Sequence, residues 1–547
     1  MIFLSIIYTN LYIFLCGKIF NLLLYKKEYS KAEIGIIGCI FISFIALLIN
    51  FFLPLNKFIN TAISILPLFL IFKKKFFVKN DLLFLIISSF FVFILLAYAK
   101  INTPDAGLYH LPFTQILNEN KLIIGLSNVH SRFGHISIIQ YLNAINFNLI
   151  SGVNGVLIPV ASLAVFIFLY FLNELIVYLK NNDNLELNNI YSLFVIIYIS
   201  YKINRYSGFG NDAIAHLLFF YLISIFLKFN FSYQNLHKLS LISIYIIQNK
   251  ITLMLSLFYP LFFFSFFKIK NFRILFSFPM IFFLLWFLKN ILTTGCIIYP
   301  IEKLCFKNLE WTNKEQIIEQ KILGEAWSKG WPDRTNLEIE KKIFNKNLNW
   351  FEAWSSIHLK YILKIILPYI FFLILIILFI NFYKTKNFTK FSINKHIKIK
   401  LIYLICTLLL SNIIFFYKFP LYRYGYSYLI TFIILLSIFL IFRYNKIIIK
   451  KIFAFLIILC LIIFVTKQIS RILNTKTNNI WPNIYSFGNK ENEQIPIEKL
   501  SLGTFKIYFK NKECMYNSEY FSPCTNIFEK NITLKQKYGF NAVTIKK

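Results

Sequence analysis

Long apolar runs separated by short polar segments divide the chain into candidate membrane spans. The runs 82–99, 153–179 and 361–382 are examples. Each is close to the roughly 20 apolar residues that an α-helix needs to cross a bilayer. A hydropathy window finds about fourteen such runs along the chain. The pattern therefore predicts an all-α polytopic membrane protein with about 12–14 transmembrane helices.

Basic residues between these runs predict which loops lie on which side of the membrane. They cluster in short loops after alternate spans, at 26–31, 73–79, 268–273, 384–400 and 443–451. The positive-inside rule places such loops in the cytoplasm. The loops between them, and the tail after about residue 468, are then expected on the outside.

The apolar stretch 239–267 is interrupted by Gln248, Asn249 and Lys250, so it fits either one long span or two short helices. A single span would reverse the predicted membrane side of every later loop, and the lysine-rich segment 384–400 would then lie outside. We therefore expect two short or half-depth helices that meet near Lys250.

These alternations predict six segments. They are the N-terminal transmembrane helices 1–99, an outside loop 100–152, transmembrane helices 153–289, a Trp-rich outside loop 290–358, the C-terminal transmembrane helices 359–467 and a small periplasmic tail domain 468–547. Helical spacing of apolar residues after Asp105 and over 136–145 predicts amphipathic helices in the first outside loop. The alternating segment Thr504–Phe509 predicts a strand, and hence a mixed or β fold for the tail. The apolar start lacks a basic n-region and a small-residue cleavage site, so we expect a retained span.

Composition supports the membrane assignment and changes the meaning of the net charge. The chain is 58% hydrophobic and 15% charged, with a mean hydropathy of +0.64, which excludes a water-soluble domain. A net charge of +34 would otherwise suggest nucleic-acid binding. Because the basic residues cluster in the loops after alternate spans, the charge reflects membrane topology. We therefore expect membrane lipid and no nucleic acid as the partner.

The cysteines fall into two groups. Cys16, Cys39, Cys406 and Cys460 lie inside predicted spans, where a thiol behaves as a small apolar group. Cys296 and Cys305, nine residues apart, and Cys514 and Cys524, ten apart, lie in predicted outside segments. Their placement suits two local disulfides in an oxidising compartment, although chance spacing is an alternative. A structural zinc site is not indicated, since no CxxC occurs.

Acidic residues are scarce in the membrane half of the chain, which draws attention to Asp105 and Asp212. Asp105 follows Pro104 ahead of a predicted helix that carries Tyr109 and His110. A carboxylate at this position suits a general base, but Asp is also a favoured helix N-cap. The same two interpretations apply to Asp212, at the predicted outer end of another span.

Two cations, Lys250 and Arg423, are expected at a similar depth on the outer side. Together they would suit a lipid phosphate, which arginine binds in a bidentate manner and lysine as a point charge. The alternative is that both side chains extend to ordinary headgroups. The histidines His110, His130 and His135 share the first outside loop, but their spacing matches no metal signature, so a divalent metal stays an open possibility.

Tryptophans are concentrated in the second outside loop. They are Trp311, Trp327, Trp331, Trp350 and Trp354. Two of the pairs are spaced i, i+4, which places their rings on one helix face. They suit anchors at the headgroup level, or else an aromatic wall for a sugar or lipid.

Three segments resemble the polytopic membrane glycosyltransferases of the GT-C type, which include the protein mannosyltransferases and the lipid A aminoarabinose transferase. Residues 105–112, DAGLYHLP, resemble the acidic first outside loop of these enzymes, and in particular a DAxxYHLP form in uncharacterised bacterial membrane proteins. Residues 289–300 resemble a following RN...SGxxxYP segment, with Lys for Arg and Thr for Ser, and 420–425 resemble a later arginine turn. The acidic loop usually follows the first span, whereas here four candidate spans precede it.

The resemblance implies transfer of a sugar from a polyprenyl-phosphate donor to an acceptor glycolipid, glycan or protein, on the periplasmic face of a bacterial inner membrane. Asp105 would deprotonate the acceptor hydroxyl, and Arg423 and Lys250 would hold the departing lipid phosphate. The residues expected at the substrate are Tyr109, His110, Asp212, Lys250 and Arg423. The alternatives are a transporter or flippase, which inverted repeats would favour, and a polymerase or ligase for polyprenyl-linked glycans.

Overall fold

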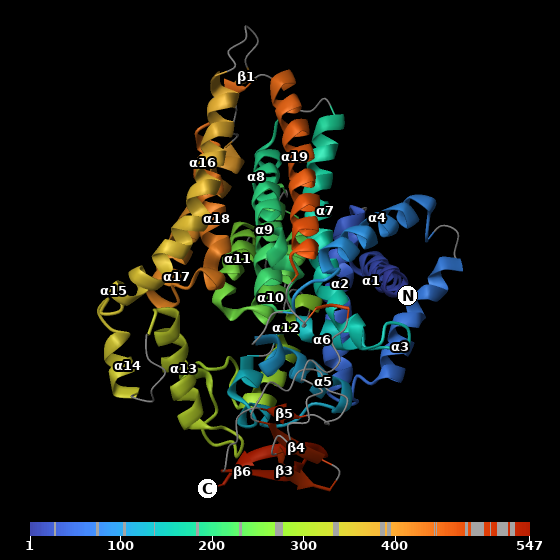
Figure 1. Ribbon diagram of the computed structural model, residues 1–547, viewed down its shortest axis with the longest axis vertical. Coiled ribbons are helices and arrows are strands. Elements are labelled where there is room, and N and C mark those ends of the chain that lie inside the picture. The colour runs from blue at the N-terminus through green and yellow to red at the C-terminus, as the bar shows by residue number, and fades with distance from the viewer. Residues whose placement is uncertain are drawn as a thin grey trace.

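The computed structural model gives an elongated helical molecule with a small strand-containing region at one end (Figure 1). The described residues are 1–26, 29–72, 76–101, 105–135, 137–181, 185–228, 232–267, 277–331, 338–382, 389–390, 395–441, 443–444, 446–475, 480–482, 497–503, 505–510, 523–525 and 531–546. Within these ranges, eight helices are long and apolar enough to cross a membrane, and four more apolar helices have 10–17 residues. The predicted all-α polytopic fold is confirmed.

The long helices are α1 (Ile2–Leu24), α2 (Lys31–Asn50), α4 (Lys79–Leu96), α7 (Ile158–Lys180), α16 (Lys360–Phe382), α17 (Lys395–Lys418), α18 (Tyr422–Phe439) and α19 (Lys446–Leu473). The shorter apolar segments are α3 (Lys57–Ile65) with η1 (Leu66–Phe72), α8 (Leu187–Tyr201), η7 (Ile251–Leu257) with α11 (Phe258–Phe267), and α12 (Phe278–Thr294). Two helices of 17 residues, α9 (Asp212–Lys228) and α10 (Tyr233–Asn249), complete the central group. Several spans are thus shorter than a window scan suggests, because polar breaks such as the one at Lys250 end the helices early.

Helices α1 and α2 cross at two glycines. A Cβ atom on Gly17 would lie 2.0 Å from the Ile34 carbonyl oxygen, and one on Gly38 would lie 2.0 Å from the Ile13 carbonyl oxygen. Only the absence of a side chain lets the two backbones approach this closely. Small residues serve the same purpose at helix crossings in membranes generally.

The segment 233–267 is a helical hairpin, as predicted from its polar interruption. Helix α10 ends at Asn249, Lys250 has an extended backbone conformation, and η7 begins at Ile251. The chain then returns through α11, which packs against α10. Lys250 therefore stands at the tip of the hairpin, outside both helices.

The predicted outside segments gather at one end of the molecule. Helices α5 (Leu111–Glu119), α6 (Ile139–Ile145) and α13 (Lys314–Ser328) lie toward the lower end of Figure 1, together with the C-terminal strands. The opposite end carries β1 (Thr389–Lys390), which pairs with β2 (Arg443–Tyr444). The remaining helices of the loop 290–358 are α14 (Glu338–Phe344) and α15 (Phe351–Trp354).

Both helices of the first outside loop are present, but they are buried on every side rather than half exposed. All residues from Leu111 to Asn118 and from Ile139 to Ile145 are buried. Their polar side chains bond inside the protein: Asn118 Nδ2 donates to the Leu55 and Ala144 carbonyls at 2.6 and 2.9 Å. The polar face that indicated a surface helix is therefore an internal hydrogen-bonding face.

The C-terminal region is built from strands, as expected. β3 (Ile497–Leu502) and β4 (Phe505–Lys510) are antiparallel, and β5 (Cys524–Thr525) joins β4 in parallel. β6 (Ile532–Lys537) and β7 (Phe540–Ile545) form a hairpin with Leu534 opposite Val543. This hairpin is tied to the first outside loop, because the amide of Val543 donates to the Ile124 carbonyl at 2.9 Å.

The structure contains the disulfide Cys296–Cys305. Cys524 is also disulfide-bonded, whereas Cys514 lies outside the described residues, so the pairing of these two stays a prediction. The remaining cysteines, Cys16, Cys39, Cys406 and Cys460, are free thiols.

Candidate functional site

Asp105 and Arg423 form an ion pair between segments that are far apart in sequence. Asp105 precedes a short π-helical turn, η2 (Ala106–His110), that continues into α5, and Arg423 stands in the first turn of α18. Arg423 Nη1 donates to Asp105 Oδ2 at 3.1 Å, and the two side chains are 32% and 30% exposed. The Asp105 side chain makes no capping hydrogen bond. The N-cap interpretation of this residue is therefore not supported.

Asp212 and Lys250 form a second ion pair. Lys250 Nζ donates to Asp212 Oδ1, and Asn211 Nδ2 donates to the Asn249 carbonyl at 3.0 Å, which holds the two turns together. Lys250 is only 6% exposed, while Asp212 is 30% exposed. Burial lowers the pKa of Lys250 from 10.5 to about 8, against the opposing effect of the Asp212 carboxylate. Lys250 and Arg423 are therefore each held by a carboxylate, and neither side chain extends freely to lipid headgroups.

The two ion pairs belong to one cluster. Lys250 Nζ and the Arg423 guanidinium lie over the same ring, that of Tyr424, at 4.7 and 5.3 Å from its centroid. The hydroxyl of Thr252, beside Lys250, donates to the Tyr424 carbonyl at 2.9 Å. The structure thus brings together the two acids and two cations that the sequence placed on the outer side.

His110 and Tyr109 line the same region, but the His110 ring is neutral, not an imidazolium, near pH 7. His110 is buried, and Gln140 Nε2 donates to its Nδ1 at 2.6 Å, so the neutral ring carries its proton on Nε2. Burial lowers the pKa of His110 from 6.5 to about 4. Burial likewise raises the pKa of Tyr109, whose ring lies 4.4 Å from that of His110. Both side chains are therefore neutral near pH 7.

Buried contacts fix the turn that carries Arg423. His216, fully buried in α9, contacts Ser427 Oγ at 2.7 Å through Nδ1 and the Arg423 carbonyl at 3.0 Å through Nε2. Trp354 Nε1 donates to the Pro420 carbonyl at 2.8 Å. Sequence reasoning missed His216, because a single histidine in an apolar helix carries no signal of its partner.

The tryptophans do not form one wall. Trp327 is 42% exposed and lies 5.0 Å from the Arg423 guanidinium, so it is the tryptophan that reaches the cluster. Trp350 and Trp354 are buried with Phe416. The remaining two make internal contacts: Trp311 Nε1 donates to the Ile291 carbonyl, and Trp331 packs on Phe344.

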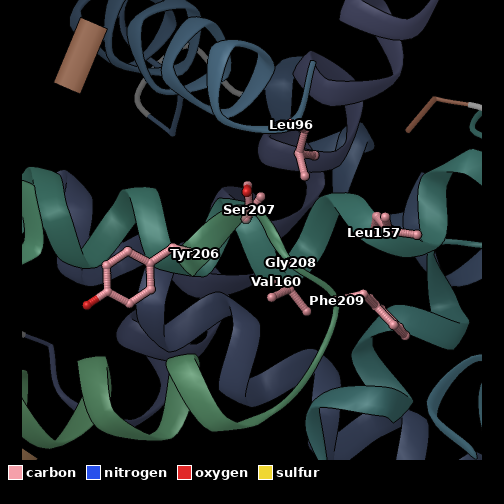
Figure 2. Close-up of a pocket in the computed structure, with 8 residues that line it drawn as sticks. Leu96, Leu157, Val160, Tyr206, Ser207, Gly208 and Phe209 are labelled. Carbon is pink, nitrogen blue, oxygen red and sulfur yellow. The ribbon is translucent and has the colours of Figure 1, made fainter. Parts of the chain in front are cut away.

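A crevice lies beside the cluster, between the end of α4 and the start of α7 (Figure 2). It is lined by Leu96, Leu157, Val160, Ala161, Tyr206, Ser207, Gly208 and Phe209. Phe209 connects it to the cluster, since its ring lies 6.3 Å from that of His110. The crevice is too narrow to admit a water molecule, so it does not hold a substrate by itself.

A metal centre has no support among the described residues, where no group of three or more His, Cys, Asp or Glu side chains converges. The three histidines of the first outside loop therefore do not form a metal site within the part of the chain that the structure describes. Asp212 has its charge compensated by Lys250.

Comparison with known proteins gives a family match. Residues 1–430 match the family model described as a domain of unknown function (DUF8201). No curated protein and no solved structure matches the chain. The matched range includes all four charged residues of the cluster.

Proposed function

The chain belongs to the DUF8201 family, and we propose that it is a membrane glycosyltransferase that moves a sugar from a polyprenyl-phosphate donor to an acceptor on the periplasmic face of the bacterial inner membrane. The observation that carries this proposal is the position of Asp105. Its carboxylate is held by Arg423, is partly exposed and does not cap the helix that follows.

Asp105 is suited to the role of general base. Oδ2 accepts from Arg423, while Oδ1 accepts no hydrogen bond from the described residues. Oδ1 takes the proton of the acceptor hydroxyl as the hydroxyl oxygen attacks the anomeric carbon. The bond from that carbon to the phosphate oxygen breaks, and the phosphate leaves with the electron pair. Attack opposite the leaving group inverts the anomeric carbon.

Neighbouring groups complete the environment of this base. Arg423 holds the Asp105 carboxylate in position through their ion pair. Trp327, partly exposed beside Arg423, offers an apolar ring face to the sugar.

The experiment compares surface glycolipids and glycoproteins by mass spectrometry. A deletion strain is complemented with the native chain, with Asp105→Asn or with Asp81→Asn. Asp81 is a control for the loss of an ion-paired carboxylate elsewhere in the protein: it is more buried than Asp105 and binds Lys18 near the start of α4, away from the cluster.

We expect the native chain and Asp81→Asn to restore a sugar that the deletion strain lacks, and Asp105→Asn to leave it absent at equal membrane levels of protein. Full restoration by Asp105→Asn would refute the proposal. Loss of glycan export, with every sugar linkage made normally, would instead favour a flippase and would equally refute it.

A further inference from the structure

The charges of the two ion pairs in the candidate site cancel, which leaves neither Arg423 nor Lys250 free to act as the counter-ion of a lipid phosphate. Arg423 is paired with Asp105 and Lys250 with Asp212, so each cation already faces one carboxylate. A phosphate that leaves as a monoester dianion needs positive charge that is not already compensated. The cations that bind it must therefore include others near the cluster.

Arg205 is one such cation. It lies in η6 (Ile203–Ser207), and its guanidinium stacks 5.1 Å from the ring centroid of Tyr426, a residue of α18. The guanidinium makes no hydrogen bond and no ion pair with the described residues. It lies within electrostatic reach of both Asp212 and Lys250. Its donors are thus available beside the cluster, which is unusual for a half-buried arginine.

Two lysines extend this positive region. Lys202 Nζ and Lys467 Nζ lie over the same ring, that of Tyr201, at 5.5 and 4.8 Å from its centroid. The amide of Arg205 donates to the Lys202 carbonyl at 2.9 Å, so the arginine follows one tight turn later. Neither lysine has an ion pair among the described carboxylates. Cations gathered without acids repel one another, so an anion that binds between them relieves that repulsion.

The group lies where helices end, at the level expected for lipid headgroups. Lys202 follows the last residue of α8, and Lys467 stands in the last turns of α19. One turn beyond Lys467, the Arg471 guanidinium donates to the carbonyls of Ile94, Leu95 and Ala97 at the end of α4. Arg471 is therefore occupied by three carbonyls, and Lys467 Nζ donates to the Tyr201 carbonyl, whereas Lys202, Arg205 and Lys467 have no ion pair with the described carboxylates.

We infer that Lys202, Arg205 and Lys467 bind a lipid-borne phosphate. Arg205 supplies the paired donors that phosphate oxygens accept, and the two lysines supply point charge. In identifying this lipid as the polyprenyl-phosphate donor, the inference rests on the proposed function. It shifts phosphate binding away from Arg423 and Lys250, and leaves those two residues to hold the acids in place.

The test measures binding to the purified full chain in nanodiscs of zwitterionic phosphatidylcholine. The probes are farnesyl phosphate, farnesol and inorganic phosphate. Arg205→Gln and the double variant Lys202→Gln/Lys467→Gln remove charge from the group, and Arg205→Lys keeps it. Lys303→Gln is the matched control, because Lys303 is an exposed lysine of the loop 290–358.

We expect farnesyl phosphate to bind the wild-type chain and Lys303→Gln equally, and at least tenfold more weakly to Arg205→Gln and to the double variant. Arg205→Lys is expected to recover part of the loss. Unchanged affinity in both charge-removing variants would overturn the inference, as would the absence of binding to the wild type. Equal competition by inorganic phosphate would also overturn it, because the ligand would then be free phosphate rather than a lipid.

Two further variants separate this inference from the proposed function. Asp105→Asn is expected to bind farnesyl phosphate normally while it fails to transfer sugar. If Arg423→Gln and Lys250→Gln lose binding while Arg205→Gln retains it, the inference is wrong and the proposed function stands. Each variant is compared at equal thermal stability, or with its Tm reported, so that unfolding is not mistaken for lost binding.

Discussion

The Lys250–Asp212 pair allows a test of the site's electrostatics that needs no substrate. Lys250 is 6% exposed and has Asp212 as its ion-pair partner, while Asp212 itself is 30% exposed. Removing one partner of a fully buried pair costs about 3–5 kcal/mol, because the other charge is left uncompensated. Water reaches Asp212, so we expect Lys250→Met to lower the free energy of unfolding by only about 1–3 kcal/mol.

The pH dependence gives a sharper result. The pKa of Lys250 is about 8 in the folded chain and 10.5 when unperturbed, so between these values the unfolded state binds one more proton than the folded state. The free energy of unfolding therefore rises with pH across this window, by about 1.4 kcal/mol per pH unit at most. Below pH 8 both states are protonated, and the contribution no longer changes.

Lys250→Arg is the control, because a guanidinium stays charged in both states over this range. Denaturant midpoints and slopes are measured for both proteins in detergent from pH 7 to 10. The difference in unfolding free energy, wild type minus Lys250→Arg, is expected to be flat below pH 8 and to rise above it. A flat difference up to pH 10 would show that Lys250 is an ordinary solvated lysine, and the geometry of the cluster would then be wrong.

Three other substitutions test helix packing and individual contacts in the fold. Gly38→Leu is expected to lower the yield of folded protein, because a side chain at this helix crossing meets a carbonyl oxygen and overpacking costs about 1–3 kcal/mol or more; Gly324→Leu, at a position with open space, should not. Lys238 Nζ lies 2.6 Å from the buried Glu33 carboxylate, so Lys238→Met leaves that carboxylate without its ion-pair partner and should lower the free energy of unfolding by about 3–5 kcal/mol. Adding Glu33→Gln should recover part of this loss. Trp354→Phe removes the hydrogen bond to the turn before α18, so sugar transfer should fall while the free energy of unfolding drops by only about 1 kcal/mol. An unchanged transfer rate would show that this bond does not position Arg423.

Much of the fold was predictable because its signals are local. Apolar runs of membrane length, basic loops and a polar break each report on a few neighbouring residues, and the break at Lys250 indicated a hairpin that the structure contains. The strand at 505–510 followed from simple alternation. The burial of α5 and α6 did not follow, since a polar helix face looks the same in sequence whether water or a backbone carbonyl, as for Asn118, satisfies it.

The candidate site was likewise predictable only in part. Scarcity singled out Asp105, Asp212, Lys250 and Arg423, because few charged residues belong in spans. Their pairing was not predictable, since Asp105 and Arg423 are 318 positions apart and no local pattern records which acid meets which cation. Arg205 was missed for a related reason, since a lone arginine between two spans looks like an ordinary loop residue.

Charge pairing also decides which roles the four singled-out residues suit. A carboxylate beside a cation forms a pair that as a whole carries no net charge. Such a pair holds the carboxylate in position, but it has little attraction left for a dianion. Binding of a phosphate is better served by cations that have no ion pair with a described carboxylate, as at Arg205, Lys202 and Lys467. On this reasoning, the proposed base and the proposed phosphate site are neighbours, since Asp212 pairs with Lys250 and also lies within electrostatic reach of Arg205.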